Sequence, residues 1–101
     1  MSKIKEFDIL ITNFFDYDIN LASKDSIYYY AIAIKKKDNK YIVLNNELNL
    51  KAIDIIKLAK ENNILIVKDQ PLTRTLYLQV EPMEKIPELF TKKLDEIYNK
   101  I

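Results

Sequence analysis

Apolar positions in this chain form short runs and helical stripes that are separated by clusters of Asn, Asp and Lys. Two runs rich in β-branched or aromatic residues, 8–12 and 27–35, predict buried strands, and the second should lie centrally in a sheet. Residues 36–40 predict a polar turn, and 41–44 predict a brief further extended segment. Segment 14–26 mixes aromatic residues with Asp and Asn without a period, so we expect a long loop there.

The middle of the chain predicts a helix followed by a strand. Asn49 stands at the N-cap position, and Asn63 is the best available substitute for the glycine that ends many helices in the left-handed conformation. The predicted buried stripe consists of Ala52, Ile55, Ile56 and Ala59, with Ile53 at its edge. The all-apolar run 64–67 predicts a strand covered on both faces. Strand, helix and strand together predict a parallel, right-handed crossover.

Two more helices are expected in the last third of the chain. Asp69 can cap the first of them, Pro71 is tolerated in its first turn, and Pro82 bounds it. Its predicted inward face is Leu72, Thr75, Leu76 and Gln79. Pro87 should begin the last helix, with an inward face of Phe90, Leu94, Ile97, Tyr98 and Ile101. These alternating elements indicate an α/β domain.

The composition argues against most kinds of active site. The chain has no Cys and no His, which excludes disulfides, thiolate nucleophiles, the commonest zinc ligands and the side chain best suited to proton transfer near neutral pH. It also has no Gly, which excludes glycine-rich phosphate loops and leaves positive φ angles to Asn and Asp. We therefore expect a protein that is not an enzyme and that uses no cofactor and no metal.

Charge and length restrict the class of protein further. The net charge is +1, which gives no field for nonspecific nucleic-acid binding. No apolar run approaches the roughly 18 residues that span a bilayer, and the N-terminus does not resemble a signal peptide. We expect one cytoplasmic domain over residues 1–101 that neither binds nucleic acid nor inserts into a membrane. Its oligomeric state is left open.

Five blocks of the chain resemble one known family in the same order and spacing. Residues 64–77, Ile-Leu-Ile-Val-Lys-Asp-Gln-Pro-Leu-Thr-Arg-Thr-Leu-Tyr, resemble the stretch I-P-I-V-E-N-P-P-L-A-R-A-L-Y of the type III secretion export-switch family, which is FlhB/SctU-like. Residues 53–63 resemble that family's helix ending in I-A-R-E-H-G, and 86–90 resemble E-I-P-P-E-L-Y. Residues 30–34 resemble its strand Y-A-V-A-L, and 8–13 resemble D-V-V-I-T-N, which leads into the cleavage motif Asn-Pro-Thr-His.

The resemblance implies a fold and a function. The family's cytosolic domain is a small mixed four-stranded sheet surrounded by about four helices, so the same fold is expected here. The implied function is that of a non-enzymatic component or regulator of flagellar or type III protein export, which docks to the export gate or to its substrates. Because the family's membrane-spanning region is absent, we expect a stand-alone short paralogue in the cytoplasm, peripheral to the export apparatus at the inner membrane.

Two alternatives to an export role are compatible with the sequence. The first is an interaction module that keeps the same fold and binds an unrelated cytoplasmic protein. The second is a small enzyme, which has little support because no arrangement of acid, base and nucleophile can be named in the sequence.

The clearest departure from the family lies at its self-cleavage motif. Asn13 matches the position of the family's cleavage Asn, but Phe14 and Phe15 follow it in place of Pro-Thr-His. A bulky residue after Asn hinders cyclisation of the Asn side chain. We therefore expect Asn13 to be inert and the chain to remain uncleaved.

The expected partner-binding residues are Arg74, Pro71, Phe14 and Phe15. A parallel crossover is expected to place the ends of the strands at Ile34 and Val67 on one sheet edge, beside the start of the Pro71 helix and the loop 14–18. Each candidate has a plain structural alternative. Arg74 can pair with a nearby carboxylate, and loop 14–18 can pack over a sheet edge.

Two other surfaces each have a functional and a structural interpretation. The tyrosines at 28–30 either form an aromatic binding surface or belong to the core and sheet cover, and a strand setting favours the core. The lysines at 35–37 either form a solvated turn or contact nucleic acid or acidic lipid, and the turn is favoured.

Overall fold

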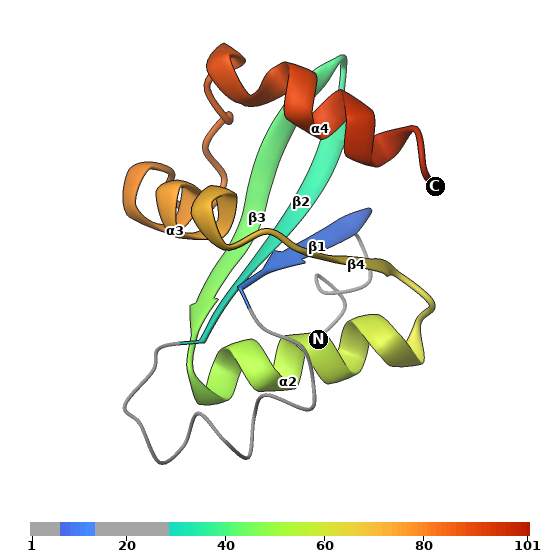
Figure 1. Cartoon of the computed structure of the whole chain (residues 1–101), viewed down its shortest axis with the longest axis vertical. Coiled ribbons are helices and arrows are strands. Elements are labelled where there is room, and N and C mark those ends of the chain that lie inside the picture. The colour runs from blue at the N-terminus through green and yellow to red at the C-terminus, as the bar shows by residue number, and fades with distance from the viewer. Residues whose placement is uncertain (1–6, 14–28) are drawn as a thin grey trace.

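A computed structural model describes residues 7–13 and 29–101 of the chain, which are drawn in colour in Figure 1. Its elements run in the order β1 (Ile9–Thr12), β2 (Tyr30–Lys37), β3 (Lys40–Leu48), α2 (Leu50–Glu61), β4 (Leu65–Lys68), α3 (Gln70–Gln79), the 3-10 helix η3 (Glu88–Phe90) and α4 (Thr91–Tyr98). The expected strands and helices are all present within the described residues.

The strands form one mixed four-stranded sheet, as the family resemblance implied, and their order is β3-β2-β1-β4. β1 pairs antiparallel with β2 and parallel with β4, and every residue of β1 is buried. The short apolar run of β1 therefore lies inside the sheet, between two partners. β3 and β4 run in the same direction, so the connection from β3 through α2 to β4 is a parallel crossover. Because β2 and β1 lie between these two strands in the sheet, the crossover passes over both.

The expectation that the ends of Ile34 and Val67 share a sheet edge was wrong. Ile9 of β1 is level with both Ile34 and Leu65, whereas Ile11 is level with Val67. The end of β2 is thus level with the start of β4, on the other side of β1. The reason is that β2 runs antiparallel to β1 and β4, so the end of β4 is level instead with the start of β2.

β2 and β3 form a long hairpin whose turn is only Asp38-Asn39. The predicted turn, which took in residues 36–40 and the lysines at 35–37, was too long, because these lysines pair with β3 as part of β2. Asp38 and Asn39 have φ angles of 54° and 65°, which suit a tight hairpin turn. β3 continues well past Leu44, because its backbone pairs with β2 across an irregularity at Ala33/Ile34 even where its side chains are polar. Asn or Asp supplies all the positive φ angles of the described residues except that of Met83, at 73°.

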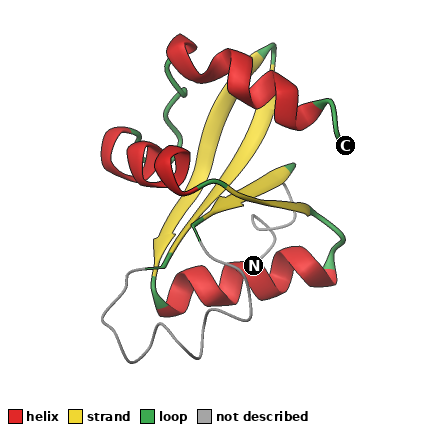
Figure 2. Ribbon diagram, viewed as in Figure 1, coloured by secondary structure: helices red, strands yellow, loops and turns green. Residues whose placement is uncertain are grey.

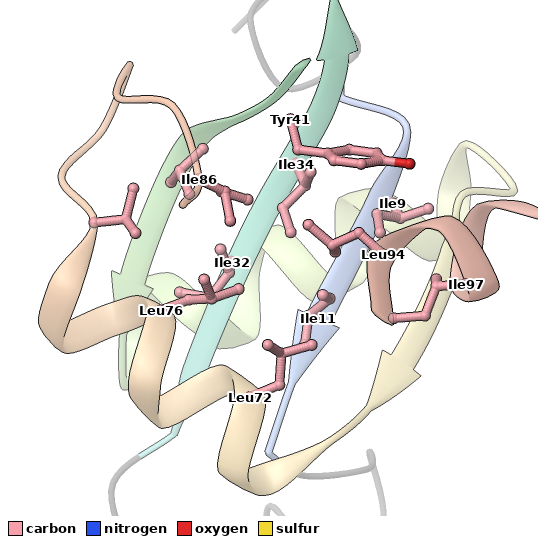
Figure 3. Packing of buried hydrophobic residues seen from close by; sticks show 12 residues of the cluster. Ile9, Ile11, Ile32, Ile34, Tyr41, Leu72, Leu76, Ile86, Leu94 and Ile97 are labelled. Atoms are coloured by element: carbon pink, nitrogen blue, oxygen red, sulfur yellow. The ribbon is translucent and has the colours of Figure 1, made fainter. Parts of the chain in front are cut away.

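Helices cover both faces of the sheet (Figures 1 and 2). α2 packs on one face through the predicted stripe of Ala52, Ile55, Ile56 and Ala59, which is buried together with Leu10, Ala31 and Ala33. α3 and α4 pack on the other face, where Figure 3 shows Leu72, Leu76, Leu94 and Ile97 pointing at Ile9, Ile11, Ile32 and Ile34. Alternate residues of the central strands therefore feed two separate cores.

The ends of α2 follow the prediction in part. Asn63 has a φ of 56°, which confirms its left-handed role after the helix. Asn49 precedes the helix but does not cap it with its side chain, because its Oδ1 accepts the Tyr29 N–H at 3.1 Å. Asn49 therefore ties the start of α2 to the start of β2.

α3 begins as predicted but buries a different face. Asp69 caps the helix by accepting the Leu72 N–H at 3.1 Å, and Pro71 lies in the first turn. Leu72 and Leu76 are buried, but Gln79 is exposed and Thr75 is only half-buried. The inward row continues instead to Val80, just past the helix, and Thr73 beside Leu72 is buried with its Oγ1 donating to the Asp69 carbonyl at 2.7 Å.

The last helix and the edge strand differ from prediction in detail. Pro87 precedes the 3-10 helix η3, and α4 itself begins at Thr91. Leu94 and Ile97 are buried, and Phe90 and Tyr98 are partly buried against the same cluster. Ile101 was expected inside but is 69% exposed, because α4 ends at Tyr98. β4 does contact both cores, yet as an edge strand it is only half-buried.

Candidate docking site

The end of β1 is joined to the start of β2 by two side chains. Thr12 Oγ1 donates to the Tyr30 carbonyl at 2.7 Å, and Asn13 Oδ1 accepts the Tyr30 N–H at 2.9 Å. Both backbone groups of Tyr30 are therefore held by residues of the neighbouring strand end. This arrangement fixes the two points at which the described chain leaves β1 and enters β2.

The first turn of α3 is attached to the same place. The Asp69 N–H donates to the Thr12 carbonyl at 2.9 Å, and the Asp69 side chain caps α3. The Lys93 ammonium of α4 lies 3.4 Å from Asp69 Oδ2, which adds a partly exposed ion pair. The start of α3 is thus held by β1, by its own cap and by α4.

An exposed ridge runs along the outer side of α3. Pro71, Arg74 and Leu78 are exposed, Leu78 by 76%, and their spacing places them on one side of the helix. Tyr77 is half-buried, and its ring centroid lies 4.6 Å from that of Tyr30 at a tilt of 49°. We call Pro71, Arg74, Tyr77 and Leu78 the α3 ridge.

Arg74 has no ion-pair partner among residues 7–13 and 29–101. The simple alternative, in which Arg74 is occupied by a nearby carboxylate, finds no support in this part of the chain. A cation beside aromatic and aliphatic side chains on a firmly anchored helix suits a protein-binding surface, since Tyr and Arg are enriched among residues that dominate such interfaces.

The structure brings some of the predicted site residues together and leaves others undescribed. Arg74 and Pro71 share the α3 ridge, and Asn13 lies at its base. Phe14 and Phe15 lie outside the described residues. Tyr77 and Leu78 were missed as candidates, although Tyr77 ends the stretch that carries the family resemblance.

The tyrosines at 28–30 have different environments. Tyr29 is 6% exposed and belongs to the core, as the strand setting favoured. Tyr30 is half-buried and pairs with Tyr77 at the surface, whereas Tyr28 lies outside the described residues.

A second polar cluster lies at the opposite end of β1. Asp8 Oδ2 accepts the Lys36 N–H at 2.8 Å and the Tyr98 O–H at 3.0 Å. Tyr41 donates its O–H to Asp95, and the rings of Tyr41 and Tyr98 lie 5.0 Å apart. These contacts hold α4 against the sheet.

Both tyrosines of this cluster are poor acids. Burial, reinforced by the hydrogen bond to Asp95 and its negative charge, raises the pKa of Tyr41 to about 12. Burial and the charge of Asp8 also raise the pKa of Tyr98 above its ordinary value. Neither tyrosine therefore gives up its proton near neutral pH.

The described residues also bear on metal binding and on membrane insertion. They contain no group of three or more acidic, His or Cys side chains that could hold a metal ion. None of their helices is long and apolar enough to cross a membrane.

The fold and the α3 ridge together define a small α/β domain with an anchored, exposed helix beside the end of its central strand. Residues 28–101 match the model of the FlhB HrpN YscU SpaS family, which is most of the chain. The chain belongs to that family.

A known relative agrees with this assignment. The chain is 38% identical over 101 residues to the flagellar biosynthetic protein FlhB of Bacillus subtilis (strain 168). The match covers 96% of this chain but only 24% of that protein. The chain therefore spans about a quarter of the length of this relative.

Solved structures show the same fold. The cytoplasmic domain of FlhB from Shewanella putrefaciens superposes with a TM-score of 0.79 at 22% identity, covering 98% of this chain and 71% of that one. A mutant EscU C-terminal domain gives a TM-score of 0.77 at 24% identity, covering 98% of this chain and 82% of that one. The implied fold is thus confirmed.

Proposed function

We propose that this domain is a non-enzymatic component or regulator of flagellar or type III protein export. It acts by docking the α3 ridge onto a cytosolic part of the export gate or onto an export substrate. Membership of the FlhB HrpN YscU SpaS family supports the export role. The observation that carries the docking mode is the exposure of Pro71, Arg74 and Leu78 on a helix whose first turn is fixed to β1.

The geometry of Asn13 supports a role without self-cleavage. Cleavage by Asn requires its side-chain amide nitrogen to reach its own carbonyl carbon. Here the amide oxygen of Asn13 is engaged by the Tyr30 N–H at 2.9 Å, which restricts rotation of the side chain. Phe14 next in the sequence adds steric hindrance.

Membership of the same family supports a proposed place of action. The Shewanella relative is a cytoplasmic domain of FlhB. We place this domain in the cytoplasm, peripheral to the export apparatus at the inner membrane.

A pull-down with the cytosolic domain of the export gate from the same organism tests the docking mode. Arg74→Glu should reduce recovery of the gate domain by about tenfold or more, as expected for an interface residue that dominates binding. The thermal midpoint should change little, because Arg74 is exposed. Lys57→Glu is the matched control, since it makes the same charge change on an exposed position of α2, across the sheet.

Three outcomes of the pull-down separate the alternatives. Loss of the gate domain with Arg74→Glu but not with Lys57→Glu supports the α3 ridge. Equal recovery with wild type and both variants removes Arg74 from the interface. Failure of the wild-type domain to bind gate or substrates would instead favour an interaction module for an unrelated protein.

A further inference from the structure

The outer side of α3 carries one charge and one exposed leucine. Arg74 is the only charged residue in the sequence of this helix, QPLTRTLYLQ, and Leu78 lies one turn further along and is 76% exposed. The nearest carboxylate in the sequence, that of Asp69, caps the helix and lies 3.4 Å from the Lys93 ammonium. Within the described part of the chain, Arg74 is therefore left without an opposite charge.

The outer side of α2 carries the opposite charge at the same spacing. Leu50 is 78% exposed, and Asp54 is exposed four residues later, so both lie on one side of the helix. No ion pair among the described residues involves Asp54. Lys51 and Lys57 lie about 60° to either side of Asp54 around the helix, and thus at the border of this surface.

The two surfaces are complementary when the helices run antiparallel. In that orientation Leu78 lies opposite Leu50 when Arg74 lies opposite Asp54, because the residues of each helix are four positions apart. A guanidinium and a carboxylate form a strong, directional pair, which sets the register of the two helices. The lysines of α2 remain at the solvated border, where salt screens their charge.

One chain cannot bring these two surfaces together by itself. α2 and α3 cover opposite faces of the sheet (Figure 1), and their outer sides point away from it. A second copy of the chain can place its α2 against the α3 of the first. An extended peptide suits α3 less well, because the backbone groups of a helix are bonded within the helix and leave none for a strand to pair with.

We propose that the α3 ridge binds the outer side of α2 of a second copy of this chain, with Arg74 paired to Asp54. Pro71, which is exposed, and Leu58, which is half-buried, meet at the far end of the contact. The two surfaces differ, so the contact is heterologous, and further copies can add to either end. A single contact between two helices is small, so the association is weak and depends on concentration.

Self-association of this kind covers the surface that is proposed to dock onto the export gate. A copy whose α3 ridge holds another copy cannot dock through that ridge, so abundant protein limits its own docking. This regulatory consequence rests on the proposed function. The contact itself does not, because it is measured on the purified domain without the gate.

Sedimentation velocity of the purified domain at rising concentration tests the contact. The wild type should sediment faster as its concentration approaches about 1 mM, as expected for weak association. Arg74→Asp and Asp54→Arg should each weaken association by about tenfold or more, because each variant sets two like charges against each other. Glu96→Arg, at an exposed position of α4, is the matched control and should associate like the wild type.

Exchanging the two charges identifies the residues that meet. The double variant Arg74→Asp/Asp54→Arg should associate like the wild type, because the pair is restored with its charges reversed. An equimolar mixture of the two single variants should also associate. A wild-type domain that stays monomeric up to about 1 mM, or a double variant as weak as the single variants, would overturn the proposal. Neither result decides docking to the gate, which the pull-down measures separately.

Discussion

At the scale of single residues, amide and hydroxyl side chains fix the backbone at points where strands end. Asn13 and Thr12 hold Tyr30, and Asn49 holds Tyr29, so β2 starts at a position set by other elements. The left-handed conformation of Asn63 and the capping role of Asp69 could be predicted from the sequence, because both depend on a helix end that is adjacent in the chain. The sequence could not predict the Tyr30–Tyr77 contact, which joins residues far apart in the chain.

Asn13 should leave the chain intact during long incubation at neutral to mildly alkaline pH. Its amide oxygen is held by the Tyr30 N–H, and Phe14 hinders ring closure. Intact-mass spectrometry should show the full chain. A pair of fragments that meet between Asn13 and Phe14 would show that the self-cleavage chemistry is retained.

The free energy of unfolding should fall at high pH because of Tyr41, whose hydroxyl keeps its proton to a higher pH in the folded state than in the unfolded state. Its folded pKa is about 12, whereas an unfolded tyrosine has a pKa of about 10. A raised folded pKa gives stability that is complete below the unfolded value and is lost as pH rises through the folded one. From pH 9 to pH 11 the domain should therefore lose about 1 kcal/mol through this residue.

Urea unfolding at a series of pH values measures this effect. Tyr41→Phe should lower stability near pH 8 through loss of the hydrogen bond to Asp95, and should then show a shallower decline than wild type. Parallel declines for the two proteins above pH 9 would mean that Tyr41 is not protected in the folded state.

At the scale of elements, hydrophobic period predicted the existence of each strand and helix better than its ends. The α2 stripe was predicted correctly because four apolar positions recur on one face. The predicted β3 was too short. Its second half is polar and is held by backbone pairing with β2, so the sequence there shows no apolar pattern that would indicate a strand. Gln79 and Ile101 were predicted to be buried because the helical spacing of apolar positions was extended to the last residue of α3 and beyond the end of α4. The helix ends themselves depend on tertiary packing.

Ile56→Ala should lower the free energy of unfolding by about 2–5 kcal/mol. Ile56 is 3% exposed and packs in the core between α2 and the sheet. Lys57→Ala is the exposed neighbour and should change stability by less than about 0.5 kcal/mol. Equal unfolding midpoints for wild type and Ile56→Ala in urea would show that α2 buries a different face.

At the scale of the whole molecule, the family resemblance predicted the mixed four-stranded sheet, which periodicity alone did not. Alternating strands and helices predicted an α/β domain, but the order β3-β2-β1-β4 depends on pairings between distant segments. The prediction of the candidate site relied in part on a wrong expectation, because the strand ends at Ile34 and Val67 do not lie at the same edge of the sheet. Arg74 and Pro71 nevertheless share an exposed surface, since α3 begins beside the end of β1.

Hydrogen exchange of the wild-type domain with and without the export gate's cytosolic domain tests the docking mode most directly. The account predicts slower exchange of amides over α3, residues 70–79, while α2 on the opposite face of the sheet is unchanged. Protection that is confined to α2, or no protection at all at gate concentrations that saturate binding, would contradict docking through the α3 ridge.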